Sequence, residues 1–131
     1  MIVGNGVDLI EIERIEAIIQ KKPHFLKRFF TERENAYFEL KNYKAETIAA
    51  TFAAKEAVSK SFGTGIRGFD LIEIEVLRDE YGKPYIVLHG RAKAVADQLA
   101  ISECQLSISH SDHMVVAFVI AIGRHSFENC N

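Results

Sequence analysis

One helix-forming segment, Phe52–Lys60, limits what this chain can fold into more than any other part of its sequence. The run combines three alanines with one acid and two lysines, inside a longer helix that we predict over Ala45–Phe62. Gly63 follows at the position where a glycine commonly ends a helix. Because alanine side chains allow a neighbouring backbone to come close, we expect this helix to pack against the protein core.

Glu56 and Lys60 are four residues apart and therefore share one face of the predicted helix. A carboxylate beside an ammonium group suits a magnesium–phosphate site, because the carboxylate binds the hard cation and the lysine contacts phosphate oxygens. The same spacing also fits an ordinary helical ion pair worth about 0.2–0.5 kcal/mol. On this segment alone, the ion pair is the favoured interpretation.

An acidic residue also stands at the end of the first predicted strand, Ile2–Asp8. This strand is apolar, contains two glycines and ends where a helical pattern of isoleucines begins. A carboxylate between a strand and a helix is a usual place for a metal ligand, so Asp8 is a second candidate. Capping of the following turn or helix is the alternative role.

The remaining hydrophobic patterns predict a mixed fold. The other expected elements are a helix over Glu11–Gln20, a helix from a Thr31 N-cap to Leu40, strands over Leu71–Arg78 and Tyr85–His89, a helix over Arg91–Ala100, and strands over Gln105–His110 and Met114–Ile122. This order indicates the α+β class, with a largely antiparallel sheet and a long packed helix. The last strand is apolar on both faces, so we expect helices or another subunit to cover its second face.

Composition excludes several classes of function. The 131 residues carry a net charge of −2, which argues against general nucleic-acid binding. No stretch approaches the roughly 18 uninterrupted apolar residues of a membrane span, and the N-terminus lacks a signal-like region, which favours the cytoplasm. Cys104 and Cys130 are too few for a disulfide framework, and the absence of a C-x-x-C motif argues against a zinc or redox site.

Five sequence segments are more informative together than any one of them alone. They read G-x-G-V-D-L-I-E-I-E-R-I, F-A-A-K-E-A-x-S-K, G-T-G-I, D-E-Y-G-K-P-Y and S-I-S-H-S, in this order. The combination resembles the holo-acyl-carrier-protein synthases, which are small phosphopantetheinyl transferases. The resemblance covers residues 1–123, which we expect to form a single domain, and leaves 124–131 as a C-terminal tail. It implies the phosphopantetheinyl transferase fold and a homotrimer joined through its sheets. Asn5 departs from the family pattern, where a hydrophobic residue or threonine is more usual.

The resemblance implies that a serine hydroxyl of apo acyl carrier protein attacks the pantetheine-side phosphate of coenzyme A. The products would be holo carrier protein, needed for fatty acid biosynthesis, and adenosine 3′,5′-bisphosphate. Such chemistry depends mainly on positioning and charge neutralisation. Asp8 and Glu56 match the family's two Mg²⁺ ligands, and Lys60 matches the lysine expected to stabilise the leaving diphosphate. Glu56 is also expected to hold the water that relays the serine proton. Lys55 points to another helix face and is expected to contact the periphery of coenzyme A or solvent.

Coenzyme A is expected at two further places. Gly63 and Gly65 follow the long helix in a region that the family uses for coenzyme A, although a helix C-cap alone explains Gly63. Ser109 and His110, at the end of a strand, are expected to line the nucleotide end of coenzyme A across a subunit boundary. A polar hairpin face is the alternative interpretation of these two residues.

The segment from Lys21 to Arg28 contains four cations and no acid. A solvated face is the ordinary explanation of such a pattern. Because acyl carrier proteins are acidic, the resemblance makes Arg14, Lys27 and Arg28 the expected docking residues. We expect these side chains to lie away from the diphosphate site.

Two other functions stay open from the sequence. The first is a module that binds coenzyme A or a nucleotide without catalysis, although such a module need not keep Asp8, Glu56 and Lys60 together. The second is a Mg²⁺-dependent diphosphate hydrolase, for which we would expect a further acidic cluster.

Overall fold

The computed structural model describes residues 1–63 and 68–124. Its elements, in chain order, are β1 (Ile2–Glu11), α1 (Ile12–Lys21), α2 (Phe25–Phe29), α3 (Glu32–Leu40), α4 (Ala45–Ser61), the 3₁₀ turn η1 (Leu71–Glu73), β2 (Ile74–Arg78), β3 (Pro84–Leu88), α5 (Gly90–Gln98), β4 (Ile101–His110) and β5 (Met114–Gly123). The predicted α+β class is confirmed.

The strands form two antiparallel sheets. Strands β1, β5 and β4 make a three-stranded sheet in that order, and β2 pairs with β3 in a hairpin. The strand that is apolar throughout, β5, occupies the centre of the larger sheet, where both of its edges are paired. The predicted antiparallel arrangement is therefore confirmed.

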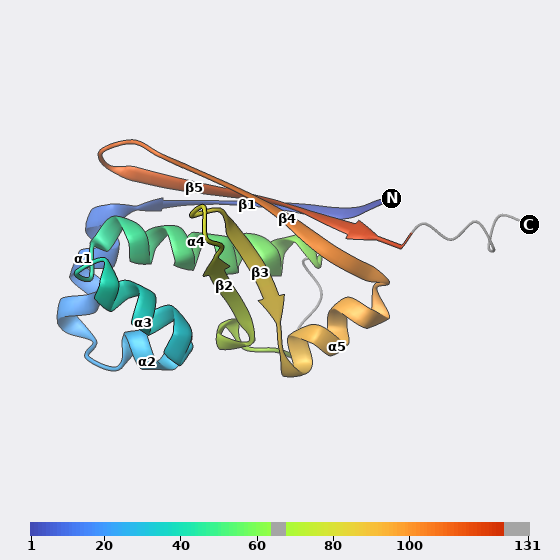
Figure 1. The fold of residues 1–131 in the computed structure, drawn as a ribbon, viewed down its shortest axis with the longest axis horizontal. Coiled ribbons are helices and arrows are strands. Elements are labelled where there is room, and N and C mark those ends of the chain that lie inside the picture. Colours follow the sequence, from blue (N-terminus) through green and yellow to red (C-terminus); the bar gives the residue numbers. More distant parts are fainter. Residues whose placement is uncertain (64–67, 125–131) are drawn as a thin grey trace, which may run out of the picture.

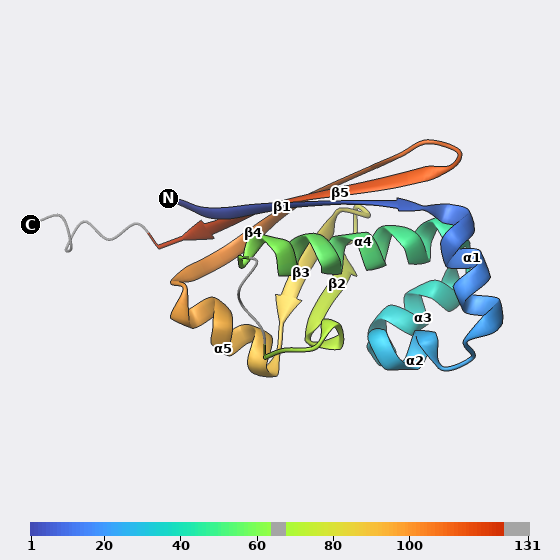
Figure 2. The same ribbon diagram turned by 180° about the vertical axis from the view of Figure 1, so that it is seen from behind.

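Helix α4 runs along the inner face of the three-stranded sheet, as Figures 1 and 2 show from opposite sides. Strand β5 turns Val115, Ala117, Val119 and Ala121 to the interior, and all four are fully buried. The β2 strand and α1 pack on other sides of α4, so that the helix is buried around most of its circumference. The expectation that this helix packs against the core is confirmed.

Strand β1 is longer than its sequence pattern predicts. Residues 9–11 continue the pairing with β5 beyond the expected end at Asp8. The strand leads directly into α1, where the backbone N–H of Ile12 donates to the carbonyl oxygen of His113 at 2.9 Å. Asp8 therefore lies within a strand and does not cap the following helix.

Helix α2 is absent from the prediction. It has only five residues, too few to be stable by propensity alone. Its first residue, Phe25, is buried against the rings of Phe29, Phe30 and Phe52, with centroid distances of 5.3, 5.7 and 5.5 Å. The position of this short helix thus depends on packing against α4, which is distant in the sequence but adjacent in space.

Local capping signals predicted the start of a helix better than the sequence predicted α2. Thr31 and Glu34 form the predicted capping box at the start of α3, in which each side chain accepts a hydrogen bond from the backbone N–H of the other. Asp70 and Glu73 close a further turn, in which Oε1 of Glu73 accepts from the backbone N–H of Asp70 at 2.8 Å. Residues 71–73 form a 3₁₀ turn there, so β2 begins three residues later than predicted.

The outer face of the three-stranded sheet carries exposed apolar side chains on β1 and β5, whereas its β4 edge is polar. In both ribbon views the described helices lie on the opposite side of this sheet (Figures 1 and 2). The side chains of Val7, Leu9 and Phe118 are 52%, 63% and 42% exposed on this face. Separately, the described part of the chain contains no helix with the length and apolar character needed to cross a membrane.

Candidate functional site

Asp8, Glu56 and Lys60 meet in one hollow between β1, α1 and α4. The ammonium group of Lys60 donates hydrogen bonds to Oδ1 of Asp8 at 2.9 Å and to the carbonyl oxygen of Val7 at 3.2 Å. The hollow has a volume of about 320 Å³, and its other lining residues are Leu9, Ile10, Arg14, Ile15, Ile18 and Phe52. Two carboxylates and two cations therefore share a partly apolar hollow.

The strand geometry explains how Asp8 reaches this hollow. Alternate residues of β1 face α4, so that Gly6, Asp8 and Ile10 share the inner face. A Cβ atom at Gly6 would overlap the carbonyl oxygen of Ala57, and the absent side chain lets β1 lie directly on α4. This contact lies two residues before Asp8 and one residue after Glu56, and it brings the two carboxylate-bearing segments together.

The charges in the hollow influence one another. Burial raises the pKa of Glu56 above its ordinary value, the negative charge of Asp8 raises it further, and Lys60 acts in the opposite direction. The side chain of Lys60 is 52% exposed, whereas that of Asp8 is only 14% exposed. Two neighbouring carboxylates repel each other, and a bound cation would remove this repulsion.

The donor set of the hollow fits magnesium. Mg²⁺ prefers oxygen ligands and is usually held by one or two carboxylates, while water and substrate phosphates fill its other positions. Asp8 and Glu56 supply two carboxylates at the edge of an open hollow. Within residues 1–63 and 68–124 there is no group of three or more His, Cys, Asp or Glu side chains that could enclose a metal by themselves.

The expectation that Lys55 contacts the periphery of coenzyme A or solvent is wrong. Its side chain is fully buried, and its ammonium group donates to Oε1 of Glu34 at 2.7 Å and to the carbonyl oxygens of Ile74 and Leu71 at 2.6 and 3.2 Å. It therefore has no surface exposed to solvent or to a ligand. The helix face that carries Lys55 is covered by α3 and β2, and three protein acceptors replace the water around its charge.

The expectation that the docking residues lie away from the diphosphate site is wrong for Arg14. Because β1 leads straight into α1, the first turn of α1 stands beside Asp8, and Arg14 lines the same hollow. Lys27 and Arg28 are exposed in α2 and do not line it. The guanidinium group of Arg28 lies over the ring of Phe29, 5.3 Å from its centroid.

Gly63 ends α4 as predicted. Its backbone N–H donates to the carbonyl oxygen of Lys60 at 3.1 Å, and its φ angle of 105° is in the left-handed region that favours glycine. This geometry explains the residue without a ligand. Gly65, the other glycine expected to contact coenzyme A, lies outside the described residues.

Ser109 and His110 do not line the hollow of Asp8 and Glu56. They border a shallower one on the outer side of the sheet, together with Ser111, Met114, Val116 and Leu9. Leu9 also lines the hollow of Asp8, so the two hollows adjoin at this residue. Nε2 of His110 lies 3.4 Å from Oε1 of Glu46, in the first turn of α4.

Comparison with known proteins identifies the family. A family model described as the 4′-phosphopantetheinyl transferase superfamily matches residues 4–119. The chain belongs to this superfamily. A holo-[acyl-carrier-protein] synthase from Caldanaerobacter subterraneus subsp. tengcongensis is 48% identical over 118 residues, which cover 90% of this chain and 93% of that relative. The family resemblance of the sequence is therefore confirmed.

Solved structures of this superfamily share the fold. The crystal structure of a holo-ACP-synthase from Plasmodium yoelii matches with a TM-score of 0.85 and 36% identity, over 95% of this chain and 98% of that one. A holo-(acyl-carrier-protein) synthase from Bacillus anthracis, in complex with CoA (3′,5′-ADP), matches with a TM-score of 0.77 and 37% identity, over 95% and 99% of the two chains. The predicted phosphopantetheinyl transferase-like fold is confirmed.

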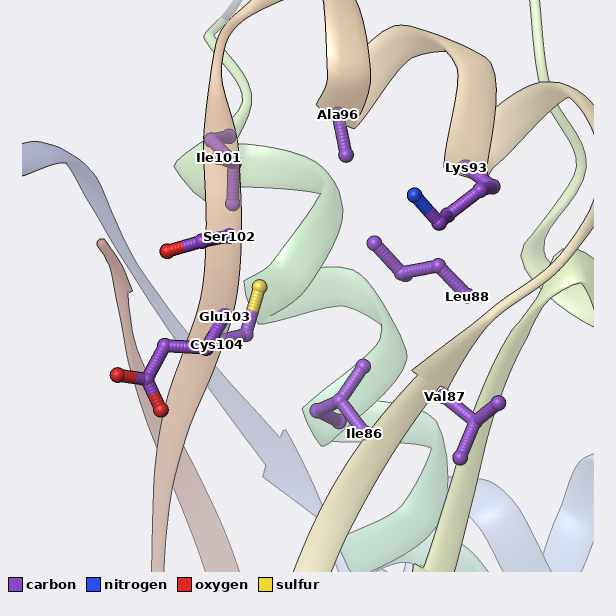
Figure 3. Close-up of a pocket in the computed structure, with 9 residues that line it drawn as sticks. All are labelled: Ile86, Val87, Leu88, Lys93, Ala96, Ile101, Ser102, Glu103 and Cys104. Carbon is purple, nitrogen blue, oxygen red and sulfur yellow. The ribbon is translucent and has the colours of Figure 1, made fainter. Parts of the chain in front are cut away.

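A further hollow of this superfamily member, of about 270 Å³, lies between β3, α5 and β4. Figure 3 shows that Ile86, Leu88, Ala96 and Ile101 surround it and that the sulfur of Cys104 points into it. Burial raises the pKa of the Cys104 thiol to about 11, so the group stays protonated near neutral pH. None of the predicted site residues lies here, and we assign this hollow no chemistry.

Sequence reasoning missed two groups that hold the residues of the candidate site or their neighbours in place. The carbonyl oxygen of Val7 accepts a hydrogen bond from Lys60, and a backbone group of this kind leaves no signal in the sequence. Glu34 was recognised only as a capping residue, although its carboxylate also pairs with Lys55 beside Glu56. A fully buried lysine could have been suspected from the small, apolar residues that surround Lys55 in the chain.

Proposed function

We propose that this chain transfers the 4′-phosphopantetheine group of coenzyme A to a serine of apo acyl carrier protein and thereby serves fatty acid biosynthesis. The observation that carries the proposal is the hollow in which Asp8, Glu56 and Lys60 meet, in a member of the phosphopantetheinyl transferase superfamily. The name of its relative from Caldanaerobacter, a holo-[acyl-carrier-protein] synthase, supports the reaction. The complex of the Bacillus anthracis protein with CoA supports the donor substrate.

In the proposed reaction the serine oxygen forms a bond to the pantetheine-side phosphorus, and the bond from that phosphorus to the bridging oxygen of the diphosphate breaks. Asp8 and Glu56 are the proposed ligands of Mg²⁺, which supplies charge neutralisation on the diphosphate when bound. Lys60 stabilises the negative charge that leaves with adenosine 3′,5′-bisphosphate. Glu56 also orients the water that accepts the serine proton.

The substrates approach the hollow from different sides in this proposal. Arg14 contacts the carrier at the edge of the hollow, and the exposed cations Lys27 and Arg28 of α2 attract the acidic carrier from farther away. Coenzyme A is assigned to the region of Gly63 and Gly65, and its nucleotide end to Ser109 and His110. These assignments are supported by the family membership and by the hollow that borders the two β4 residues.

A homotrimer is part of the proposal. A group of exposed apolar side chains on one face, such as that of β1 and β5, commonly marks a protein interface. Association through Val7, Leu9 and Phe118 would cover this face and would place the hollow of Ser109 and His110 at a subunit boundary. The cytoplasm is the proposed compartment, since coenzyme A and fatty acid synthesis are found there.

The decisive experiment incubates the purified chain with coenzyme A, Mg²⁺ and apo acyl carrier protein, followed by mass spectrometry of the carrier. A mass increase equal to one phosphopantetheine group supports the transfer. Release of free phosphopantetheine without modification of the carrier would instead indicate a diphosphate hydrolase. Binding of coenzyme A with no reaction at all would indicate a binding module.

A further inference from the structure

Lys55 is a fully buried lysine, and the proposed reaction gives it no contact with a substrate. Its ammonium group has three acceptors, which are Oε1 of Glu34 and the carbonyl oxygens of Ile74 and Leu71. The ring of Phe30 lies beside the ammonium nitrogen, 5.2 Å away. One acceptor is thus available for each ammonium proton, and the position of the group is fixed in several directions at once.

The acceptors of Lys55 belong to three separate elements. Glu34 comes from α3, Leu71 from η1 and Ile74 from β2. The Glu34 carboxylate is itself held in place, because Oε2 accepts from the backbone N–H of Val76 at 2.8 Å and Oε1 from that of Thr31 at 2.9 Å. The side chain of Lys55 therefore attaches α4 to three other elements through hydrogen bonds, on the side away from β1.

We propose that Lys55 is a positioning residue that fixes the rotation of α4 about its axis and so presents Glu56 and Lys60 to Asp8. The inference rests on the proposed function. Glu56 follows Lys55 directly, so any turn of the helix at Lys55 moves the Glu56 carboxylate as well. With side-chain ends roughly 5–6 Å from a helix axis, a rotation of about 20° displaces a carboxylate by about 2 Å. A misplacement of about 1 Å can lower a reaction rate by about 10²-fold.

Two contacts together then determine the position of α4, the helix that carries Glu56 and Lys60. Gly6 against Ala57 determines how closely β1 approaches α4, and Lys55 determines how α4 is turned. Stability alone is a poor explanation for a buried ion pair, because well-packed apolar residues of similar volume often stabilise a protein as much or more. A charge with three directed hydrogen bonds specifies an orientation, which an apolar side chain does less well.

The test compares the wild-type protein with the double variant Glu34→Gln/Lys55→Met, which removes both charges and keeps similar side-chain lengths. Transfer of phosphopantetheine and hydrogen–deuterium exchange of the α4 amides are measured for both proteins. We expect kcat to fall by 10- to 100-fold, KM for coenzyme A and for the carrier to stay within about twofold, and the amides of residues 53–61 to exchange at least fivefold faster.

Thr51→Ala is the matched control. Thr51 is also buried in α4, one turn before Lys55, and its hydroxyl donates only to the carbonyl oxygen of Thr47 in the same helix, at 3.0 Å. We expect this variant to lose some stability and to keep the wild-type kcat and exchange rates at residues 53–61. An equal loss of kcat in Thr51→Ala, or wild-type kcat and exchange in the folded double variant, would overturn the proposal.

A milder variant covers the case in which the double variant does not fold. Glu34→Gln keeps one acceptor oxygen for Lys55, but it removes the negative charge and the acceptor of the Val76 N–H. We expect a three- to tenfold lower kcat with unchanged KM values. Wild-type kcat in this variant would also overturn the proposal. If the wild-type protein itself transfers nothing, the proposed function fails, and the exchange comparison alone decides whether Lys55 immobilises α4.

Discussion

Gly6 of β1 lies against the carbonyl oxygen of Ala57 in α4, with no space for a side chain between the two backbones. The contact joins the strand that carries Asp8 to the helix that carries Glu56. An analogous contact joins Gly4 to the carbonyl oxygen of Ser61, one helical turn later. The spacing of the site therefore depends on glycines that have no functional group of their own.

The substitution Gly6→Ala is expected to force β1 away from α4. Overpacking of this kind costs about 1–3 kcal/mol of stability, and a displacement of about 1 Å between Asp8 and Glu56 should lower kcat by about 10²-fold. Urea unfolding and the transfer assay measure the two effects. Glu80→Ala, in the exposed turn after β2, is the control and should retain both stability and activity. Full activity in a folded Gly6→Ala protein would contradict this account of the site.

Asp8→Asn and Glu56→Gln test the proposed metal ligands with little change in shape. Each should lower kcat by about 10²–10³-fold, because the loss of one strong electrostatic contact to a transition state has an effect of this size. The melting temperature should change little. Chelation of Mg²⁺ should abolish the wild-type reaction, and added Mg²⁺ should restore it. Asp97→Asn, which removes an exposed carboxylate of α5, is the control. Turnover at the wild-type rate in either site variant would remove that residue from the site.

The elements with strong local signals were predictable from the sequence. The alanine-rich run and Gly63 marked α4, and the spacing of Thr31 and Glu34 marked the start of α3. These signals act within a few residues of one another, so sequence alone contains them. Helix α2 was not predictable in the same way, because its position depends on the packing of Phe25 against Phe52 in another helix.

The sequence motifs singled out Asp8, Glu56 and Lys60, which line one hollow in the structure, but the surroundings of these residues could not be predicted. Helical spacing places Lys55 on a different face from Glu56, yet it does not tell which face the rest of the protein covers. In the structure α3 and β2 cover the face of Lys55. Arg14 was misplaced for a similar reason, since the direct passage from β1 into α1, which brings it beside Asp8, is a tertiary arrangement.

Charge reversal in α2 tests the docking of the carrier. The variant Lys27→Glu/Arg28→Glu should raise KM for the acyl carrier protein by about tenfold, because like charges slow the encounter with an acidic partner. KM for coenzyme A should not change, since neither residue lines the hollow of Asp8. Added salt should weaken the wild-type interaction at fixed Mg²⁺, because exposed charges are screened over about 8 Å at physiological ionic strength.

Two further variants make the docking test specific. Lys93→Glu reverses an exposed charge in α5 and should leave both KM values unchanged. Arg14→Glu should raise KM for both substrates, because Arg14 lines the hollow itself. An unchanged carrier KM in the α2 variant would mean that these two cations form only a solvated surface.

Phe118→Asp tests the proposed homotrimer. The residue lies on the outer face of the central strand β5, beside Val7 of β1, and a carboxylate buried there without a partner would strongly oppose association. We expect light scattering to detect trimers of the wild-type protein and monomers or aggregates of the variant. Tyr81→Asp changes an 87% exposed aromatic residue in the β2–β3 turn and should leave the assembly intact. A monomeric wild-type protein with full activity would disprove the shared site.

Acid should destabilise the protein partly through Glu75. Burial alone would raise the pKa of this carboxyl group, but hydrogen bonds from Thr31 at 2.6 Å, from His89 at 2.9 Å and from Arg33 outweigh it and hold the pKa below its ordinary value of 4.5. The unfolded chain therefore takes up this proton at a higher pH than the folded protein. The stability that Glu75 contributes is complete above about pH 4.5 and is lost as the pH falls through the pKa of the folded state.

The variant Glu75→Gln isolates this contribution, because its amide cannot titrate. We expect the free energy of unfolding of the variant to lie below that of the wild type at pH 7, with the difference shrinking steadily between pH 5 and pH 3 in urea titrations. Glu80→Gln, in the exposed turn after β2, is the control. It measures how much the free energy of unfolding changes when any one carboxylate is removed. A difference between wild type and Glu75→Gln that is independent of pH would mean that the hydrogen bonds of Glu75 do not favour its charged form.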